Sequence, residues 1–199
     1  MGRFAETARS ELEESSKVML RTREECATSV EAIIERLIQT YKCGGKVLIC
    51  GNGGSAAEAQ HIAGELVGRF KIDRDGLPAI ALTASDSIIT AIANDYGYSR
   101  VFSRQVETLA RPGDVLVGLS TSGNSQNVVQ AFHAAREMGV FTVCLTGGTG
   151  GEGARTADIA LIIPSVRTPN IQEAHLAIGH IICSAIEEEL LAGRVSNGE

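Results

Sequence analysis

A histidine and a carboxylate that could together move protons, His61 and Glu65, stand four residues apart in a stretch with helical spacing. At about 100° per residue the two positions lie about 40° apart around a helix, so both side chains project from one face. Imidazoles and carboxylates are the commonest general acids and bases near neutral pH. Such a pair is also ordinary on an exposed helix surface, so by itself it does not indicate a site.

The last apolar-patterned stretch of the chain carries a second polar pair, Gln172 and His180. Eight residues place the two positions about 80° apart around a helix, so the side chains can reach toward a common point. His175 faces well away from His180, and we interpret it as a packed or surface histidine. We interpret the remaining histidine, His133, as structural.

A glycine-rich loop, residues 51–55, precedes the first of these helices and has the sequence Gly51-Asn52-Gly53-Gly54-Ser55. Glycines let backbone N–H groups approach a ligand closely, and a helix N-terminus favours an anion, so the loop predicts a phosphate cradle. The loop also matches the dinucleotide fingerprint G-x-G-x-x-G/A. The acid that this fingerprint requires, Asp73 or Asp75 here, comes before the second predicted strand instead of at its end, which disfavours a dinucleotide.

A second loop, residues 120–125, concentrates hydroxyl groups at the start of another predicted helix. Its four hydroxyl side chains belong to Ser120, Thr121, Ser122 and Ser125. A Ser/Thr-rich helix cap is the alternative interpretation, but one hydroxyl is enough for a cap. Two donor-rich loops on neighbouring strands therefore favour phosphate binding, and a dinucleotide site does not require the second loop.

Short apolar runs alternate with helical patterns from residue 46 onward, which predicts a parallel sheet with helices on both faces. The expected strands are 46–50, 78–82, 114–119, 140–145 and 158–164, and the expected helices are 55–70, 85–94, 99–110, 125–138 and 168–192. This is the pattern of one doubly wound α/β domain. Ligands of such sheets bind beyond the carboxyl ends of the strands, where both loops are expected to lie.

An N-terminal extension, residues 1–43, precedes this sheet region, residues 44–199, in what we expect to be a single domain covering 1–199. Apolar spacing over 5–42 predicts a pair of helices that stop at Gly44 and Gly45. Packing on another subunit and packing on the chain's own sheet are both compatible with so much apolar surface.

Composition excludes several classes of protein. A net charge of −6, an aromatic content of 4% and the absence of Trp disfavour nucleic-acid binding. Residues 1–30 are too charged for a signal peptide, and no apolar run is long enough for a membrane helix. Five scattered cysteines without a CxxC pair indicate a reduced cytoplasmic protein. No GxxxxGK[ST] loop is present, which disfavours a nucleoside triphosphatase.

The chain resembles the sugar isomerase (SIS) domain family and, within it, the bacterial phosphoheptose isomerases. The similarity extends over essentially the whole sequence and includes "CGNGGSAAEAQH", "GELVGRF", "PAIAL", "TAIANDYGY", "VFSRQVE", "RPGDVL", "STSGNS", "IQEAH" and "IGHI". The resemblance implies a flavodoxin-like five-stranded sheet, a homotetramer, and active sites formed between subunits. It also implies an aldose–ketose isomerase that converts sedoheptulose 7-phosphate to D-glycero-D-manno-heptose 7-phosphate through an enediol, for surface glycans such as lipopolysaccharide.

The same resemblance assigns roles to individual residues. Glu65 and His180 correspond to the acid/base pair, and one Zn²⁺ per subunit is implied, with His61, Glu65, Gln172 and His180 as ligands. The residues implied to bind the phosphosugar are Asn52, Gly53, Gly54, Ser55, Glu65, Asn94, Asp95, Ser120, Thr121, Ser122, Ser125 and Gln172. Two positions depart from the family pattern: Asn170 stands where Arg is usual, and Pro169 where some members carry an acid.

Three other functions compete with an isomerase. A non-enzymatic SIS-domain adaptor, resembling the tetramer that binds the replication initiator, would lack Glu65 and His180, and both are present. A sugar-phosphate-sensing regulator would normally have a basic DNA-binding segment, which this acidic chain does not offer. A dinucleotide-dependent oxidoreductase is disfavoured by the second hydroxyl-rich loop.

Overall fold

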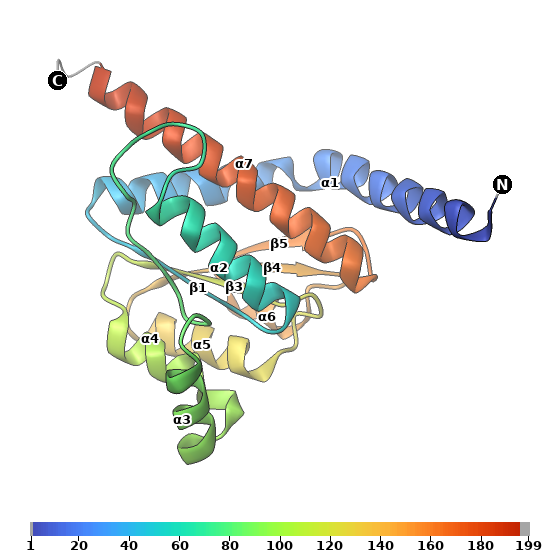
Figure 1. Cartoon of the computed structure of the whole chain (residues 1–199). Helices are drawn as coiled ribbons and strands as arrows, with labels where there is room; N and C mark the ends of the chain where they lie inside the picture. Colours follow the sequence, from blue (N-terminus) through green and yellow to red (C-terminus); the bar gives the residue numbers. More distant parts are fainter. Residues whose placement is uncertain (1, 196–199) are drawn as a thin grey trace.

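The computed structural model describes residues 2–195, with side chains up to Leu191, and centres on a five-stranded parallel sheet (Figure 1). The strand order is β2-β1-β3-β4-β5, which is the flavodoxin-like order expected. The strands are β1 (Val47–Gly51), β2 (Ala79–Ala81), β3 (Val115–Leu119), β4 (Phe141–Gly147) and β5 (Ile159–Ile163). All five fall within two residues of the predicted boundaries.

Helices cover both faces of the sheet, which explains why the strand sequences are apolar without interruption. Along β1, Val47 and Ile49 pack in a core with α1 (Arg3–Lys42), α2 (Gly54–Val67) and α7 (Thr168–Val195). The alternate residues, Leu48 and Cys50, pack in a second core with α3 (Asp86–Tyr96), α4 (Ser103–Leu109) and α5 (Gln126–Glu137). The doubly wound prediction is confirmed.

The N-terminal extension is one 40-residue helix, α1, so the prediction of a helix pair is wrong. No Gly or Pro occurs between Arg3 and Lys42, and nothing therefore interrupts the backbone ladder. The predicted stop is confirmed, because Gly44 has φ +75° and the N–H groups of Gly44 and Gly45 bond back to α1 carbonyls. From Val18 onward α1 packs on the sheet and α7 through residues such as Ile33 and Leu37, whereas residues 3–13 are all exposed and the helix begins beyond the body (Figure 1).

Two details of the helices differ from expectation. The segment 99–110 is divided into a 3-10 turn, η1 (Tyr98–Arg100), and α4. A short helix, α6 (Gly151–Thr156), lies in a glycine-rich stretch that sequence patterns leave as loop, because glycine is a poor helix former. Contacts with the loop at 120–125 hold its beginning: the N–H of Gly153 donates to Gly123, and that of Glu152 donates to the Asn124 side chain.

Helices α2 and α7 lie side by side along one face of the sheet (Figure 1). Gly179 permits their close approach, since a Cβ there would come within 2.9 Å of the Ile62 side chain. The two helices that carry the predicted chemical residues are therefore neighbours.

His175, interpreted above as either a packed or a surface histidine, is fully buried within this packing. Its Nε2 donates to the carbonyl of Thr146 over 3.2 Å, and burial lowers its pKa to about 4. Between about pH 6.5 and pH 4, His175 is protonated in the unfolded chain but stays neutral in the native state. The free energy of unfolding should therefore fall across this interval, by as much as about 3 kcal/mol.

Denaturant unfolding of the wild type and His175→Gln at pH 7 and pH 4.5 measures this effect. We expect a smaller pH-dependent loss of stability in the variant, whose side chain does not titrate. Equal losses in both proteins would assign the acid sensitivity to other groups.

Two further sequence expectations concern cysteines and membranes. All five cysteines are free thiols, and only Cys43 is exposed. Within residues 2–195, no helix combines the length and the apolar character needed to cross a membrane.

Candidate active site

The two donor-rich loops lie side by side at the carboxyl end of the sheet, because Gly51 of β1 is in register with Leu119 of β3. In the first loop, Gly53 has φ +57°, which only glycine adopts easily, and it leads directly into α2. Ser55 is buried at the first turn of α2. At that helix end the N–H groups of Ser55 and Ala56 donate to the carbonyls of Asn52 and Gly53, so those of Gly53 and Gly54 are the ones that suit an anion.

In the second loop, hydroxyls and backbone groups are held in a compact turn. Ser120, at 5% exposure, donates from its Oγ to that of Ser125 over 2.9 Å. Gly123 has φ +67° and packs so tightly on Gly150 that any Cβ would collide with the backbone. Thr121 and Ser122 complete the turn through their own backbone and hydroxyl contacts. This turn leaves neutral donors beside the start of α5.

A polar network that the sequence analysis missed joins the two loops. The side-chain amides of Asn52 and Asn127 donate to each other over 2.9 and 2.8 Å, and the hydroxyl of Tyr98 donates to Asn52 over 2.9 Å. The Asn52 side chain thus connects the two loops, and its backbone lies in the glycine loop that is predicted to bind phosphate. Asn127 follows Ser125 by two residues in the predicted helix, but no local pattern indicates that its amide would face another loop.

Asn94 and Asp95 lie exposed near the end of α3, where the side chain of Asn94 donates to that of Asp95. Tyr98, three residues beyond Asp95, donates to Asn52. The end of α3 therefore lies beside the glycine loop, while the rest of the helix stands away from the sheet (Figure 1).

His61, Glu65 and His180 meet between α2 and α7, with one potential ligand atom from each residue within 4.8 Å of the others. The two Nε2 atoms of the histidines lie 2.8 Å apart, so one ring donates a hydrogen bond to the other. Nε2 of His61 is 3.5 Å from Oε1 of Glu65. The cluster is partly open to solvent, as a site for an incoming substrate requires.

Gln172 lies about 12 Å from His180 along α7, by the helical rise of eight residues. Its side chain packs on Gly54, where any Cβ would come within 2.4 Å of the Gln172 amide nitrogen. Gln172 therefore lies at the end of the α2–α7 pair nearer the glycine loop, and the His61–Glu65–His180 cluster lies farther along it. Asn170, one of the departures from the family pattern, is buried and donates to Glu173.

An aromatic ring that the sequence analysis did not single out stacks on the cluster. Phe70 faces the imidazole of His180 with ring centroids 5.3 Å apart and an angle of 20° between the planes. His133 is exposed on α5, away from this arrangement.

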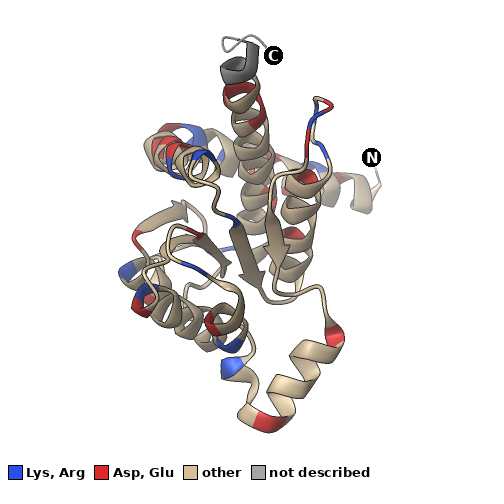
Figure 2. Ribbon diagram, turned by 90° about the vertical axis from the view of Figure 1, so that its left-hand side faces the viewer, with Lys and Arg blue, Asp and Glu red and all other residues tan. Residues whose placement is uncertain are grey.

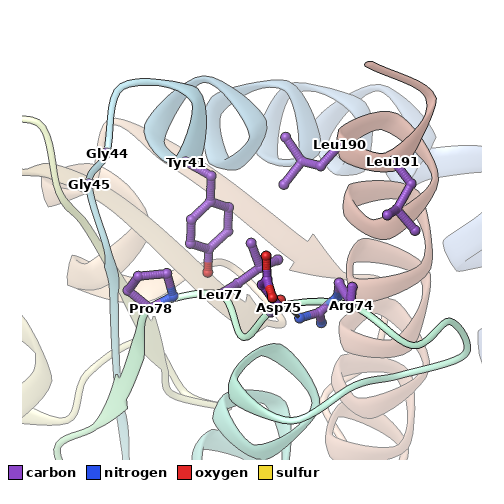
Figure 3. A pocket seen from close by; sticks show the side chains of 9 residues that line it. All are labelled: Tyr41, Gly44, Gly45, Arg74, Asp75, Leu77, Pro78, Leu190 and Leu191. Carbon is purple, nitrogen blue, oxygen red and sulfur yellow. Dashed lines mark hydrogen bonds between the residues drawn. The ribbon is translucent and has the colours of Figure 1, made fainter. Parts of the chain in front are cut away.

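A separate cavity of about 240 Å³ lies at the opposite, amino-terminal end of the strands (Figure 3). Gly44, Gly45 and Pro78, which precede β1 and β2, line it, together with Tyr41. Figure 3 shows the Tyr41 hydroxyl pointing into the space beside Pro78 and Leu77. The cavity lies away from the two loops, but Arg74, which also lines it, donates to the backbone carbonyl of Glu65.

Comparisons with known proteins agree with this arrangement. The sequence profile of the SIS domain matches residues 12–147. A phosphoheptose isomerase from Trichlorobacter lovleyi is 58% identical over 166 residues, which are 83% of this chain and 85% of that protein. The chain belongs to the SIS domain family, among the phosphoheptose isomerases.

Solved structures of phosphoheptose isomerases have the same fold as this SIS-domain chain over most of its length. The phosphoheptose isomerase from Neisseria gonorrhoeae superposes with a TM-score of 0.89 at 41% identity, covering 93% of this chain and 99% of that one. The phosphoheptose isomerase from Francisella tularensis superposes with a TM-score of 0.91 at 35% identity, covering 94% of this chain and all of the other.

The hydroxyl loop of this SIS domain allows a direct test of phosphate binding. Replacing Ser120 and Ser125 together by Ala removes two donors, each worth about 1.5–3 kcal/mol to a charged acceptor. We expect affinity for a phosphosugar, measured by calorimetry, to fall roughly 100-fold or more. Thr108→Ala, which removes an exposed hydroxyl bonded within α4, serves as the control. Unchanged affinity in the double variant would place the phosphate elsewhere.

Proposed function

We propose that this protein isomerises sedoheptulose 7-phosphate to D-glycero-D-manno-heptose 7-phosphate. One observation carries the proposal: α2 begins at the glycine loop and, farther along, presents Glu65 to His180 of the neighbouring helix α7. From Ser55 to His61 and Glu65 the helix rises about 9–15 Å. A heptulose phosphate carries its phosphate six carbons from C1, so an extended chain suits this span.

The acid/base roles follow from what the reaction requires. A ketose becomes an aldose when a proton moves between C1 and C2 through an enediol, while another shifts between O1 and O2. We assign the carbon-bound proton to Glu65, whose carboxylate can serve both carbons from one side. His180, reaching across from α7, protonates and deprotonates the oxygens.

The loops supply binding and orientation in this scheme. Ser55, Ser120, Thr121, Ser122 and Ser125, with the N–H groups of Gly53 and Gly54, offer neutral donors to the phosphate. Asn94 and Asp95, at the end of α3, are proposed to contact the sugar chain beside the glycine loop. Holding the substrate at both ends restricts C1 and C2 to the region of Glu65 and His180.

We further propose that the cluster binds one Zn²⁺ per subunit. Two imidazoles and a carboxylate with ligand atoms within 4.8 Å are a donor set that zinc prefers. Gln172 would join His61, Glu65 and His180 as a fourth ligand if its side chain moved from Gly54 toward the cluster. When bound, the ion would polarise the substrate carbonyl as a Lewis acid. Elemental analysis of the purified protein should find one zinc per chain, and none in His61→Gln.

The quaternary structure that we propose is a homotetramer with sites at subunit interfaces. An apolar groove of about 540 Å³ runs between α1 and α7, lined by residues that include Met19, Ile34 and Ile181. Ile181 is 53% exposed, and burial against a second copy would remove this apolar surface from water. Light scattering of the purified chain tests the assembly.

The cellular setting that we propose follows from this chemistry. Five free thiols suit the reducing cytoplasm, and the activity requires neither nucleic acid nor a membrane. The product would enter the synthesis of ADP- or GDP-heptose for lipopolysaccharide core, capsule or other surface glycans.

Incubation with sedoheptulose 7-phosphate, followed by NMR, tests the proposed activity. We expect signals of the aldoheptose phosphate to appear and the reaction to stop at an equilibrium mixture. Binding of the ketose without turnover, with zinc supplied, would contradict an isomerase and favour an adaptor or a sensor.

A further inference from the structure

The segment that joins α2 to β2, residues 68–78, contains no helix or strand, yet it carries the ring that faces the proposed acid/base histidine. It arches beside α7 on its way back to the sheet (Figures 1 and 2). Charged residues of both signs follow one another along it (Figure 2). A segment without regular structure needs other contacts to keep Phe70 in place.

Glu187 of α7 provides one set of these contacts. Its side chain is 1% exposed and accepts hydrogen bonds from the backbone N–H groups of Phe70, Lys71 and Ile72 over 2.7, 2.8 and 3.3 Å. Although burial acts to raise it, these N–H groups and the neighbouring guanidinium lower the pKa of Glu187. The carboxylate is therefore charged and directly holds the backbone of Phe70.

Arg74 closes the arrangement from the other side. Its side chain is 4% exposed, and its Nε donates to Glu187 over 2.9 Å. The remaining guanidinium nitrogens donate to the carbonyls of Glu65 and Leu66, in the last turn of α2, over 3.0 and 2.9 Å. Arg74 lies against α7 in Figure 3. One buried ion pair thus connects α7, the end of α2 and the segment that carries Phe70.

Both ends of this connection reach the proposed chemistry. Phe70 covers one face of the His180 imidazole, which limits how that ring can turn and shields that face from water. Arg74 holds the backbone carbonyl of Glu65 itself. A buried ion pair is weak evidence for added stability, because desolvation opposes the attraction between the charges, and a role in fixing geometry accounts for it better.

We propose that Arg74 and Glu187 are positioning residues for the isomerase reaction, which act through Phe70 to hold the His180 ring in its working orientation. The kinetic part of this inference rests on the proposed function. The structural part, that the ion pair fixes Phe70 over His180, is independent of the proposed function.

NMR of the full-length protein with 13C-labelled histidine tests the structural part. With only four histidines, the His180 signals can be assigned by their loss in His180→Gln. Stacking predicts an upfield ring-current shift of the His180 ring protons in the wild type. Phe70→Leu should abolish this shift, and Arg74→Gln or Glu187→Gln should reduce it.

A matched control exists in a different ion pair, directly before β3. Asp114 is also a buried carboxylate, and it accepts from two backbone N–H groups, those of Lys46 and Arg111, and from the Lys46 ammonium. Asp114→Asn breaks an ion pair of the same kind, whose partners Lys46 and Arg111 belong to neither the 68–78 segment nor α7. It should leave the His180 signals unchanged. Equal displacement of these signals by Asp114→Asn, or no displacement by Phe70→Leu, would overturn the proposal.

Steady-state kinetics tests the catalytic part. We expect Phe70→Leu, Arg74→Gln and Glu187→Gln to lower kcat roughly 10- to 100-fold, as misplacement of a reacting group does, with KM changed by less than about threefold. Phe70→Tyr, which keeps the ring, should retain most of the wild-type kcat, and Asp114→Asn should retain it as well.

The outcomes separate the two proposals. An inactive wild type whose stacking shift is reduced in Arg74→Gln would reject the proposed function and support the ion pair's structural role. An active wild type whose three variants keep the wild-type kcat would reject the positioning role. If Glu187→Gln does not fold, Phe70→Leu and Arg74→Gln provide the same comparison.

Discussion

Glu65→Gln should lose isomerase turnover by roughly 10²- to 10⁴-fold, the contribution typical of a positioned general base. Glutamine keeps the length and shape of the side chain but cannot accept the C1 or C2 proton. Phosphosugar affinity should remain, because the proposed phosphate contacts lie at the other end of α2. The informative measurement is solvent deuterium exchange at C1 of the bound ketose, recorded alongside turnover.

Controls make this result specific to the carboxylate. Glu107→Gln changes an exposed glutamate that pairs with Arg100, outside the loops and the cluster, and should behave as the wild type does. Zinc content must be recorded for each protein, since Glu65 is also a proposed ligand. Normal exchange at C1 in Glu65→Gln would show that the base lies elsewhere, and His61 and Glu65 would revert to a metal-binding or structural role.

His180→Gln is expected to be inactive to a similar degree, because the oxygens of the enediol would lose their acid and base. Glutamine can still donate a hydrogen bond, so ketose binding should change much less than kcat does. His133→Gln, on the exposed surface of α5, should retain wild-type turnover. His175→Gln should also stay near wild-type turnover at neutral pH, since His175 is buried away from the cluster. A kcat near the wild-type value in His180→Gln would exclude the assigned role.

The sheet and both donor-rich loops could be predicted because their signals are local. Runs such as Val115–Leu119 are apolar on both faces, and a parallel sheet between helix layers is the arrangement that buries them. Glycines and hydroxyls directly after such runs indicate anion sites at helix starts. The error at α1 arose because the length of a helix depends on the absence of breakers, which apolar spacing does not reveal. α6 could not be predicted, since contacts with the 120–125 loop hold a glycine-rich segment in helical form.

The sequence by itself determined the fold class, the position of both loops and the pairing of His61 with Glu65, because each depends on neighbours within a few turns of chain. Only the tertiary structure decided that His180, 119 residues beyond His61, lies 2.8 Å from it. It also decided that Asn127 joins the two loops, and that Arg74 and Glu187 hold Phe70 over the imidazole. These contacts depend on how α2, α7 and the 68–78 segment pack together, and helical spacing specifies the face of a helix but not the partner that the face meets.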